Sequence, residues 1–312
     1  MRYHFVLLCA IAWQAAAADP AEDLFNQSRQ WLQEGDLIRA RDGFGNAWKQ
    51  FTKDRGDQDR RTTEARIFYA QLLALTDNPQ KAFTVLGSLV QGTSRTSLIA
   101  RSAFALALRQ DGQHKRSVKM LEELVRIFPR EDADDLLIVG RLQSELATSY
   151  AYLRKYSKSE AAAIEGVRLL DASGERFRIY RPASLIVLGN SQLLAGHNAE
   201  AAATLSEARS AVLPTSRREI AILDGSLGVV ALRSGRLEEA ERRTRASLAV
   251  LTELFGPEHS EVAATSQQLV AVLNRQQRKA EAREIEARTR EIMNRRNTRP
   301  TAVSAWSWHD VK

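Results

Sequence analysis

The histidines are the first residues to consider for chemistry, because imidazole binds metal ions and transfers protons near neutral pH. His114, His197, His259 and His309 lie about 50 or more residues apart along the chain. A zinc site on one helix needs two histidines four positions apart, as in the His-Glu-x-x-His motif, and no two of these histidines have that spacing. We therefore interpret them as solvated side chains, with His114 and His197 in turns, and predict no metal site.

Nucleotide binding and covalent catalysis would each need a recognisable loop. Residues 43–45 read Gly-Phe-Gly, but no strand precedes them and no third glycine follows, as a phosphate-binding loop requires. We interpret this segment as a site of close helix packing. The sequence also contains no Gly-x-Ser-x-Gly elbow and no Gly-Lys-Ser or Gly-Lys-Thr loop. We therefore expect a protein without catalytic activity and without a cofactor.

The composition favours long helices and almost no strand. Of the 312 residues, 7 are proline and 16 are glycine, and aromatic residues make up 7%. Alanine, leucine, arginine, glutamate and glutamine dominate the composition, and all five have a high propensity for the α-helix. A chain of this length can form two globular domains or one elongated array. The composition indicates the array.

Residues 1–18 have the features of a secretory signal peptide. Arg2 supplies a positive start, residues 5–13 an apolar stretch, and residues 16–18 three alanines typical of a cleavage site. An uncleaved membrane anchor is the alternative, but the apolar stretch is shorter than the roughly 20 residues that span a bilayer. We expect cleavage after Ala18 and a periplasmic or secreted mature chain with no membrane span.

The single cysteine, Cys9, lies within this segment. Residues 6–8 before it are bulky, whereas a bacterial lipoprotein signal has a small residue just before the cysteine, so we expect no lipid anchor. The mature chain would then contain no thiol, which agrees with an oxidising compartment and excludes disulfide bonds.

The chain is basic, with a formal net charge of +7 and a pI of about 9.7. Its cations alternate with acids along helices, as in residues 238–243, which is the pattern of a solvated face with ion pairs. We therefore expect no nucleic-acid binding. An acidic protein or peptide partner, or an anionic surface of the cell envelope, is consistent with the charge.

A repeated pattern of small residues runs through the chain. Each follows a short polar turn and opens a helix, at spacings of 42, 35, 42, 42, 39 and 42 residues. These residues are Ala40, Ala82, Ser117, Ser159, Ala201, Ala240 and Ala282. Five positions before each lies a turn residue, and four of the seven are glycine, as expected where a helix ends in the left-handed conformation. The turn residues are Gly35, Asp77, Gly112, Arg154, Gly196, Gly235 and Gln277.

A second series of small residues lies twelve positions before the first. Its members are Ser28, Ala70, Ala105, Ala147, Gly189, Gly228 and, as the one large residue, Val270. Two antiparallel helices need small side chains where their backbones cross, so we expect the two series to face each other in seven helix pairs. The prolines agree, because six fall between units and Pro79 falls in a turn.

This pattern resembles the tetratricopeptide repeat, which combines a Leu-Gly pair, a small residue, a bulky residue four positions later and a closing proline. The matches are Leu188-Gly189 and Leu227-Gly228 for the pair, Phe44, Leu86, Leu121 and Leu205 for the bulky site, and Phe128-Pro129 for the close. The 42-residue spacing and the linker 254–262 resemble the longer repeats of kinesin light chains and bacterial relatives. The resemblance implies an all-α, right-handed superhelical solenoid of about seven helix pairs within a domain of residues 19–297.

Four positions depart from the consensus of this family. Ser117 and Ser159 stand where alanine is expected, and Thr244 and Glu286 stand where a bulky residue is expected. Glu286 fits a final helix that caps the stack, because a terminal repeat presents a polar face to water. The other three leave the packing of their units to be seen.

The resemblance also implies a binding surface, because the first helix of each unit lines a concave groove in this family. The polar groove positions are Arg109, Gln110, Arg141, Thr148, Tyr152, Asn190, Arg233, Asn274 and Arg275, and the apolar ones include Leu106, Ile186, Leu193, Val229 and Leu232. Such a surface suits an extended peptide or a helix. Family members that grip a terminal carboxylate place lysine and asparagine four apart, but the matching pair here is Ile186 and Asn190, so that mode is not expected.

Residues 298–312 form a tail in which Trp306 and Trp308 stand close together. Two readings are open: the tryptophans cover the last helix, or they dock into a partner or into the protein's own groove. For the whole chain we predict an exported, non-catalytic scaffold that binds a protein or peptide in its groove. The alternative is a structural or oligomerisation component of a cell-envelope assembly without a dedicated ligand.

Overall fold

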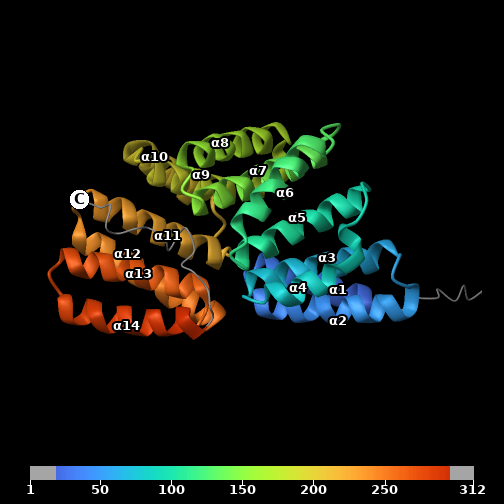
Figure 1. The fold of residues 1–312 in the computed structure, drawn as a ribbon, viewed down its shortest axis with the longest axis horizontal. Coiled ribbons are helices and arrows are strands. Elements are labelled where there is room, and N and C mark those ends of the chain that lie inside the picture. Colours follow the sequence, from blue (N-terminus) through green and yellow to red (C-terminus); the bar gives the residue numbers. More distant parts are fainter. Residues whose placement is uncertain (1–18, 296–312) are drawn as a thin grey trace, which may run out of the picture.

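Seven antiparallel helix pairs make up the computed structural model over residues 19–295, the part of the chain that the structure describes (Figure 1). The helices are α1 (Pro20–Gln33), α2 (Leu37–Arg55), α3 (Arg60–Leu75), α4 (Pro79–Leu86), α5 (Arg95–Gln110), α6 (His114–Ile127), α7 (Ala133–Tyr152), α8 (Tyr156–Ala172), α9 (Arg181–Ala195), α10 (Asn198–Ala211), α11 (Arg217–Arg233), α12 (Leu237–Phe255), α13 (Ser260–Arg275) and α14 (Lys279–Arg295). Two 3-10 segments, η1 (Gly87–Val90) and η2 (Glu175–Tyr180), follow α4 and α8.

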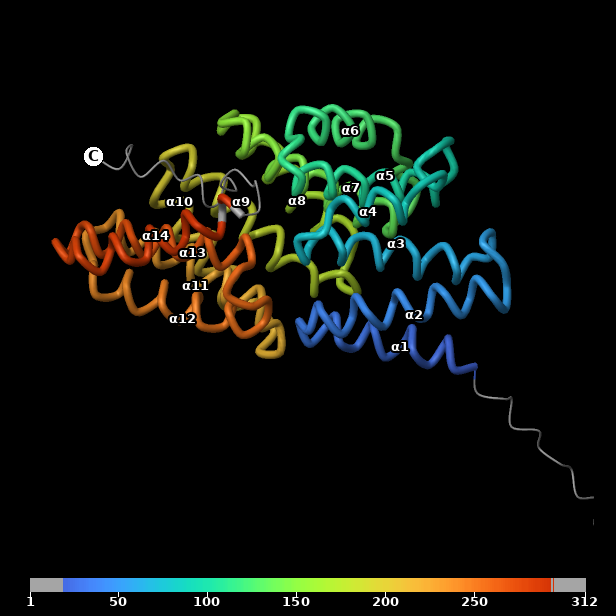
Figure 2. Tube along the Cα trace, turned by 60° about the horizontal axis from the view of Figure 1, so that its bottom comes forward, coloured from blue at the N-terminus to red at the C-terminus, as the bar shows by residue number. Residues whose placement is uncertain are grey.

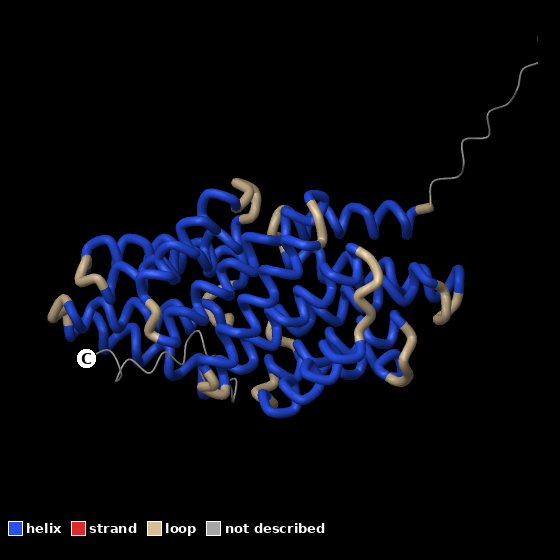
Figure 3. Tube along the Cα trace, turned by 90° about the horizontal axis from the view of Figure 1, so that it is seen from above, coloured by secondary structure: helices blue, strands red, loops and turns tan. Residues whose placement is uncertain are grey.

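The pairs stack in chain order into a solenoid, and no strand occurs between residues 19 and 295 (Figure 3). Successive units turn so far that the path bends back on itself. Units 1 and 2, in blue and teal, therefore lie beside units 6 and 7, in orange and red (Figures 1 and 2). Among the described helices, none combines the length and apolar character needed to cross a bilayer. The predicted all-α solenoid of seven helix pairs is confirmed.

The turns within the units confirm the register residue by residue. All seven predicted turn positions have positive φ angles, and three of them are not glycine: Asp77 at 58°, Arg154 at 57° and Gln277 at 65°. A side chain at such a φ angle is uncommon, because its Cβ crowds the backbone. The three turn residues that are not glycine therefore adopt the same left-handed conformation as the four glycines.

Two buried serines explain why alanine is absent from their positions. The Ser117 hydroxyl donates to the Ala105 carbonyl at 2.8 Å, and the Ser159 hydroxyl donates to the Ala147 carbonyl at 2.9 Å. These carbonyls lie twelve residues earlier, at the predicted partner positions of the helix crossing. Ser159 Oγ also lies 2.8 Å from Ser191 Oγ in the next unit. The hydroxyls thus join the two helices of a pair and connect neighbouring units.

We expect Ser159→Ala to lower the free energy of unfolding by about 1 kcal/mol, because it removes a buried hydrogen bond. Urea denaturation followed by circular dichroism measures the change. Ser206→Ala is the matched control, since the Ser206 hydroxyl makes a similar bond to the Ala202 carbonyl on an exposed surface. Equal stability of both variants would show that the family's alanine serves as well as serine at position 159.

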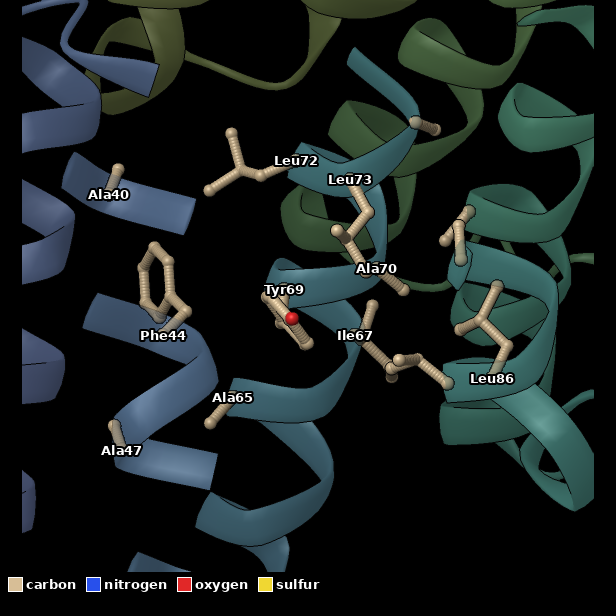
Figure 4. Close-up of a cluster of buried hydrophobic side chains, with 14 of the residues drawn as sticks. Ala40, Phe44, Ala47, Ala65, Ile67, Tyr69, Ala70, Leu72, Leu73 and Leu86 are labelled. Atoms are coloured by element: carbon tan, nitrogen blue, oxygen red, sulfur yellow. The ribbon is translucent and has the colours of Figure 1, made fainter. Parts of the chain in front are cut away.

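The bulky sites of the repeat form the core. Phe44, Leu86, Leu121 and Leu205 are all fully or almost fully buried. Figure 4 shows the first cluster, in which Phe44 from α2 and Leu86 from α4 lie on either side of α3. Thr244, expected to be a poor bulky residue, is fully buried beneath Gly228, where an added Cβ would lie 2.8 Å from its hydroxyl. Thr244 thus packs closely against the consensus glycine, at a position where the family has a bulky side chain.

The segment 43–45 serves close packing, as predicted. A Cβ at Gly43 would lie 2.2 Å from Ser28 Oγ on α1, and a Cβ at Gly45 would lie 2.9 Å from the Tyr69 ring on α3. The other end of the stack is polar, since Glu286 is exposed and its carboxylate pairs with Arg290 at 3.0 Å. The expectation that Glu286 belongs to a capping helix is confirmed.

Candidate binding surface

The polar positions predicted for the groove differ in their place along the first helices. Six lie at or next to the carboxyl ends of these helices, and three lie within a helix. The six are Arg109, Gln110, Tyr152, Arg233, Asn274 and Arg275, and the three are Arg141, Thr148 and Asn190.

Arg109 and Tyr152 do come together, at the junction of units 3 and 4. The guanidinium of Arg109 lies 5.8 Å from the Tyr152 ring centre and bonds to Glu145 Oε2 at 2.8 Å. Tyr152 stacks on His114, with 4.3 Å between the ring centres. Burial opposes the charge of Arg109, but Glu145 and Tyr152 together raise the pKa of Arg109 above its ordinary value. Gln110 is half-buried at the end of the same helix.

Arg233 serves the packing of neighbouring units. Its Nη1 atom donates to the Leu193 carbonyl at 2.5 Å and to Asn198 Oδ1 at 2.7 Å. These bonds tie the end of α11 to the end of α9 and the start of α10. Burial lowers the pKa of Arg233. A substitution here would therefore disturb the stack as well as any ligand.

Arg141 is exposed, and it belongs to a patch that sequence reasoning did not find. Its guanidinium lies 5.7 Å from the ring of Tyr180, the last residue of η2. Tyr180 and Ile179 are 40% and 56% exposed, which is high for large apolar side chains. Arg176 and Arg178 precede them on η2, where they pair with Asp134 at 3.0 Å and Glu175 at 2.9 Å. We call Arg141, Arg176, Arg178, Ile179 and Tyr180 the η2 patch.

The remaining polar positions make few contacts. Thr148 donates its hydroxyl to the Ser144 carbonyl at 3.0 Å, and Asn190 is half-buried on α9. Asn274 and Arg275 are exposed at the end of α13. Trp306 and Trp308 lie outside the described residues.

The apolar positions predicted for the groove mostly belong to the core instead. Ile186, Leu193 and Val229 are buried in one hydrophobic cluster, and Leu232 is buried in the next. Leu106 is half-buried. The prediction of apolar pockets was wrong for the four buried residues, because their side chains pack inside hydrophobic clusters with neighbouring units.

The histidines differ from one another. His197 is exposed in its turn, where the carboxylate of Glu160, 3.0 Å away, raises its pKa. His114 is half-buried, and His259 is only 4% exposed. The interpretation of His259 as a solvated side chain was therefore wrong. His309 lies outside the described residues, and no group of three or more potential metal ligands occurs between residues 19 and 295.

A contact between distant units was also missed by sequence reasoning. Asp77, in the turn of unit 2, accepts a hydrogen bond from the Ser260 backbone at 2.9 Å and another from its hydroxyl at 2.8 Å. His259 Nε2 lies 3.0 Å from the Leu75 carbonyl oxygen. These bonds join segments about 184 residues apart. The only sequence signal for them was an aspartate at a turn position that usually holds glycine.

The fold and turn geometry define an all-α helical repeat solenoid. Residues 219–295 match the tetratricopeptide repeat family model, and the other units repeat the same helix pair and positive-φ turn. No curated protein matches the chain in sequence.

Three solved structures are similar in fold. One is a Rap protein complexed with competence and sporulation factor, with a TM-score of 0.65, 10% identity, and coverage of 90% of this chain and 78% of that one. The apo form of the quorum sensor NprR from B. thuringiensis has a TM-score of 0.55, 13% identity, and coverage of 88% and 78%. A chain of the APC/C hetero-tetramer Cut9-Hcn1 has a TM-score of 0.61 and 13% identity over 87% of this chain and 45% of that one. At these identities the likeness shows the fold alone.

Proposed function

We propose that this protein is an exported, non-catalytic scaffold that binds an acidic peptide or protein segment, with the predicted groove position Arg141 and the rest of the η2 patch as the anchor. The exposed apolar side chains of Ile179 and Tyr180 next to Arg141 carry the proposal. Apolar contact beside a cation that makes no ion pair with a described residue suits a ligand that has both aromatic or aliphatic and acidic residues. The similar Rap fold holds competence and sporulation factor, which supports a solenoid of this shape as a scaffold for a bound partner.

Arg141 is the best residue with which to test this function. It is exposed, and it makes no ion pair with another described residue, so a substitution should leave the fold intact. The mature chain, residues 19–312, would be used to select binders from a display library of random peptides. We expect acidic peptides with apolar residues to be enriched, and Arg141→Glu to weaken their binding at least about tenfold.

The matched control is Arg242→Glu, which makes the same charge change at an exposed position of α12, the second helix of its unit. We expect it to bind the selected peptides as the unchanged protein does. Equal losses in both variants would mean that overall charge decides binding, and no loss in either would remove the η2 patch from the proposal. Absence of any enriched peptide would favour a purely structural or oligomerisation role.

Export is tested separately by sequencing the amino terminus of the protein purified from its host, which should begin at Asp19.

A further inference from the structure

The contact between units 2 and 7 is small and mostly polar. It joins the linker between α12 and α13 to the carboxyl end of α3 and the turn that follows. Among helix pairs between residues 19 and 295 with substantial contact, α2 and α12 alone connect units 1 and 2 to units 6 and 7. Neighbouring units along the chain are instead joined by continuous hydrophobic clusters. The contact can therefore break while the units themselves stay folded.

The contact explains why residue 77 is an aspartate. Its φ angle of 58° would suit glycine, the residue found at four of the seven equivalent turns. An aspartate there carries a conformational cost that glycine avoids. Its carboxylate accepts both polar hydrogens of Ser260, one from the backbone and one from the hydroxyl. Hydrogen bonds to a charged group are stronger than neutral ones, and these offset the cost.

The contact also explains why residue 259 is a histidine, as a comparison of two linkers shows. Gly56 and Gly256 begin the linkers before α3 and α13 with nearly the same conformation, at φ 83° and 82°. Asp59 then caps α3, and His259 caps α13 by accepting the Glu261 N–H at its Nδ1 atom, 3.2 Å away. Because Nδ1 accepts, the proton of neutral His259 lies on Nε2 and is donated to the Leu75 carbonyl. Histidine can thus cap the helix and reach unit 2, whereas aspartate can only cap.

Phe255 brings apolar contact to the same place. Its ring stacks on His259 with 4.2 Å between the ring centres. It also packs against the hydrophobic cluster of units 1 to 3 and against the cluster formed by Ala221, Leu251 and Val262. The polar bonds of Asp77 and His259 therefore surround a small apolar bridge between the two ends of the solenoid.

The interior that this contact encloses holds charged groups from three units. Arg218 pairs with Glu261, and the charge of Arg109 acts on both. Burial opposes both charges, but the pairing raises the pKa of Arg218 and lowers that of Glu261. The Nε atoms of both arginines and Oε2 of Glu261 are buried without a hydrogen-bond partner among the described residues. Buried polar atoms without partners are costly, and they oppose the closed arrangement. These atoms therefore reduce the net stability of the closed arrangement.

We infer that the contact of Asp77, His259 and Ser260 is a latch that closes the superhelix and controls access to its concave side. The inference rests on the proposed function, since a partner anchored at Arg141 would extend along the concave side that the latch closes. It assigns a regulatory role to Asp77, His259 and Ser260, none of which is a predicted groove residue.

Acidic pH should open the latch. Protonation of His259 would place a hydrogen on Nδ1, against the Glu261 N–H, and remove the cap of α13. The charged groups around the ring are Asp77 from the unit 2 turn, Glu261 from α13 and Arg218 from α11. Burial lowers the pKa of His259 below its ordinary value of 6.5. The closed state is then fully stabilised above pH 6.5 and loses this contribution as pH falls from there through the lowered pKa.

The test measures the distance between the two ends of the solenoid. Spin labels on cysteines introduced at the exposed positions Asn26 on α1 and Glu284 on α14 report it in residues 19–312, which contain no other cysteine. We expect one narrow distance distribution at about pH 8, and a broader, longer one at about pH 5. In Asp77→Gly the ratio of open to closed molecules should rise at least about tenfold at both pH values.

Arg154→Gly is the matched control, because it makes the same change to glycine at an equivalent turn with φ 57°, away from the latch. We expect it to behave as the unchanged protein does. His259→Asp is the second variant: it keeps a side chain that can cap α13 but loses the donor to Leu75 and faces Asp77. Circular dichroism checks that both latch variants stay helical. The latch would be overturned if Asp77→Gly and His259→Asp gave the same distance distributions as Arg154→Gly at both pH values. No ligand is needed, so failure of peptide binding and failure of the latch are separate outcomes.

Discussion

Replacing Phe44 with alanine is expected to lower the free energy of unfolding by about 3–5 kcal/mol, the cost of removing a large aromatic side chain from a packed core. Phe44 is fully buried in α2. Its ring stacks on Phe68 of α3 at 4.8 Å and meets Phe25 of α1 edge-on at 5.2 Å. One side chain thus joins three helices of units 1 and 2, and no neighbour is free to fill the space left behind.

Urea denaturation of the Phe44→Ala protein, monitored by circular dichroism, measures this loss. Ile179→Ala is the control, because Ile179 is 56% exposed and its truncation should change stability by no more than about 0.5 kcal/mol. A similar small change in both variants would mean that the first unit contributes little to the cooperative stability of the stack. A separate early transition in Phe44→Ala would mean that units 1 and 2 unfold by themselves.

A leucine at Gly140 is expected to have the second largest effect, lowering the free energy of unfolding by about 3 kcal/mol. A Cβ at Gly140 on α7 would lie 3.0 Å from the Gly166 carbonyl oxygen on α8, and a Cβ at Gly166 would lie 3.0 Å from the Gly140 carbonyl oxygen. The two backbones therefore touch, and a larger side chain must push the helices apart. Backbone cannot move aside as a flexible side chain can.

Thermal denaturation of Gly140→Leu measures this effect, with Ala161→Leu as the control. Ala161 lies on the exposed side of α8, where a leucine meets no neighbouring helix. We expect the midpoint of Ala161→Leu to stay near that of the unchanged protein. An equal midpoint for Gly140→Leu would show that α7 and α8 can separate at little cost.

The helix pairs were predictable from sequence because each depends on residues close together in the chain. The turn residues five positions before each small residue all have the expected conformation, including Arg154 and Gln277, which are not glycine. The serines at 117 and 159 looked like defects in the pattern, but hydroxyl bonds to carbonyls twelve residues earlier make them part of it. Local patterns of size and conformation carried this information.

The candidate site was predicted less well, because it depends on how far each unit turns relative to the last. That angle is the sum of many small packing differences between units and has no simple sequence signature. The predicted pair of Arg109 and Tyr152 came together within neighbouring units. The burial of Val229 depends on a hydrophobic cluster that neighbouring units form together, and the contact of His259 with Leu75 depends on the bend of the whole solenoid. The pattern within one repeat predicted neither.

The meeting of units 2 and 7 also limits how this protein can change in length. In an open solenoid each repeat touches only its neighbours, so repeats can be gained or lost with little effect on the others. Here the path must return to its starting point for Ser260 to reach Asp77. Adding or deleting one unit between them would shift every later unit and separate the two residues. The number of repeats is therefore fixed by the contact between Ser260 and Asp77 that closes the molecule.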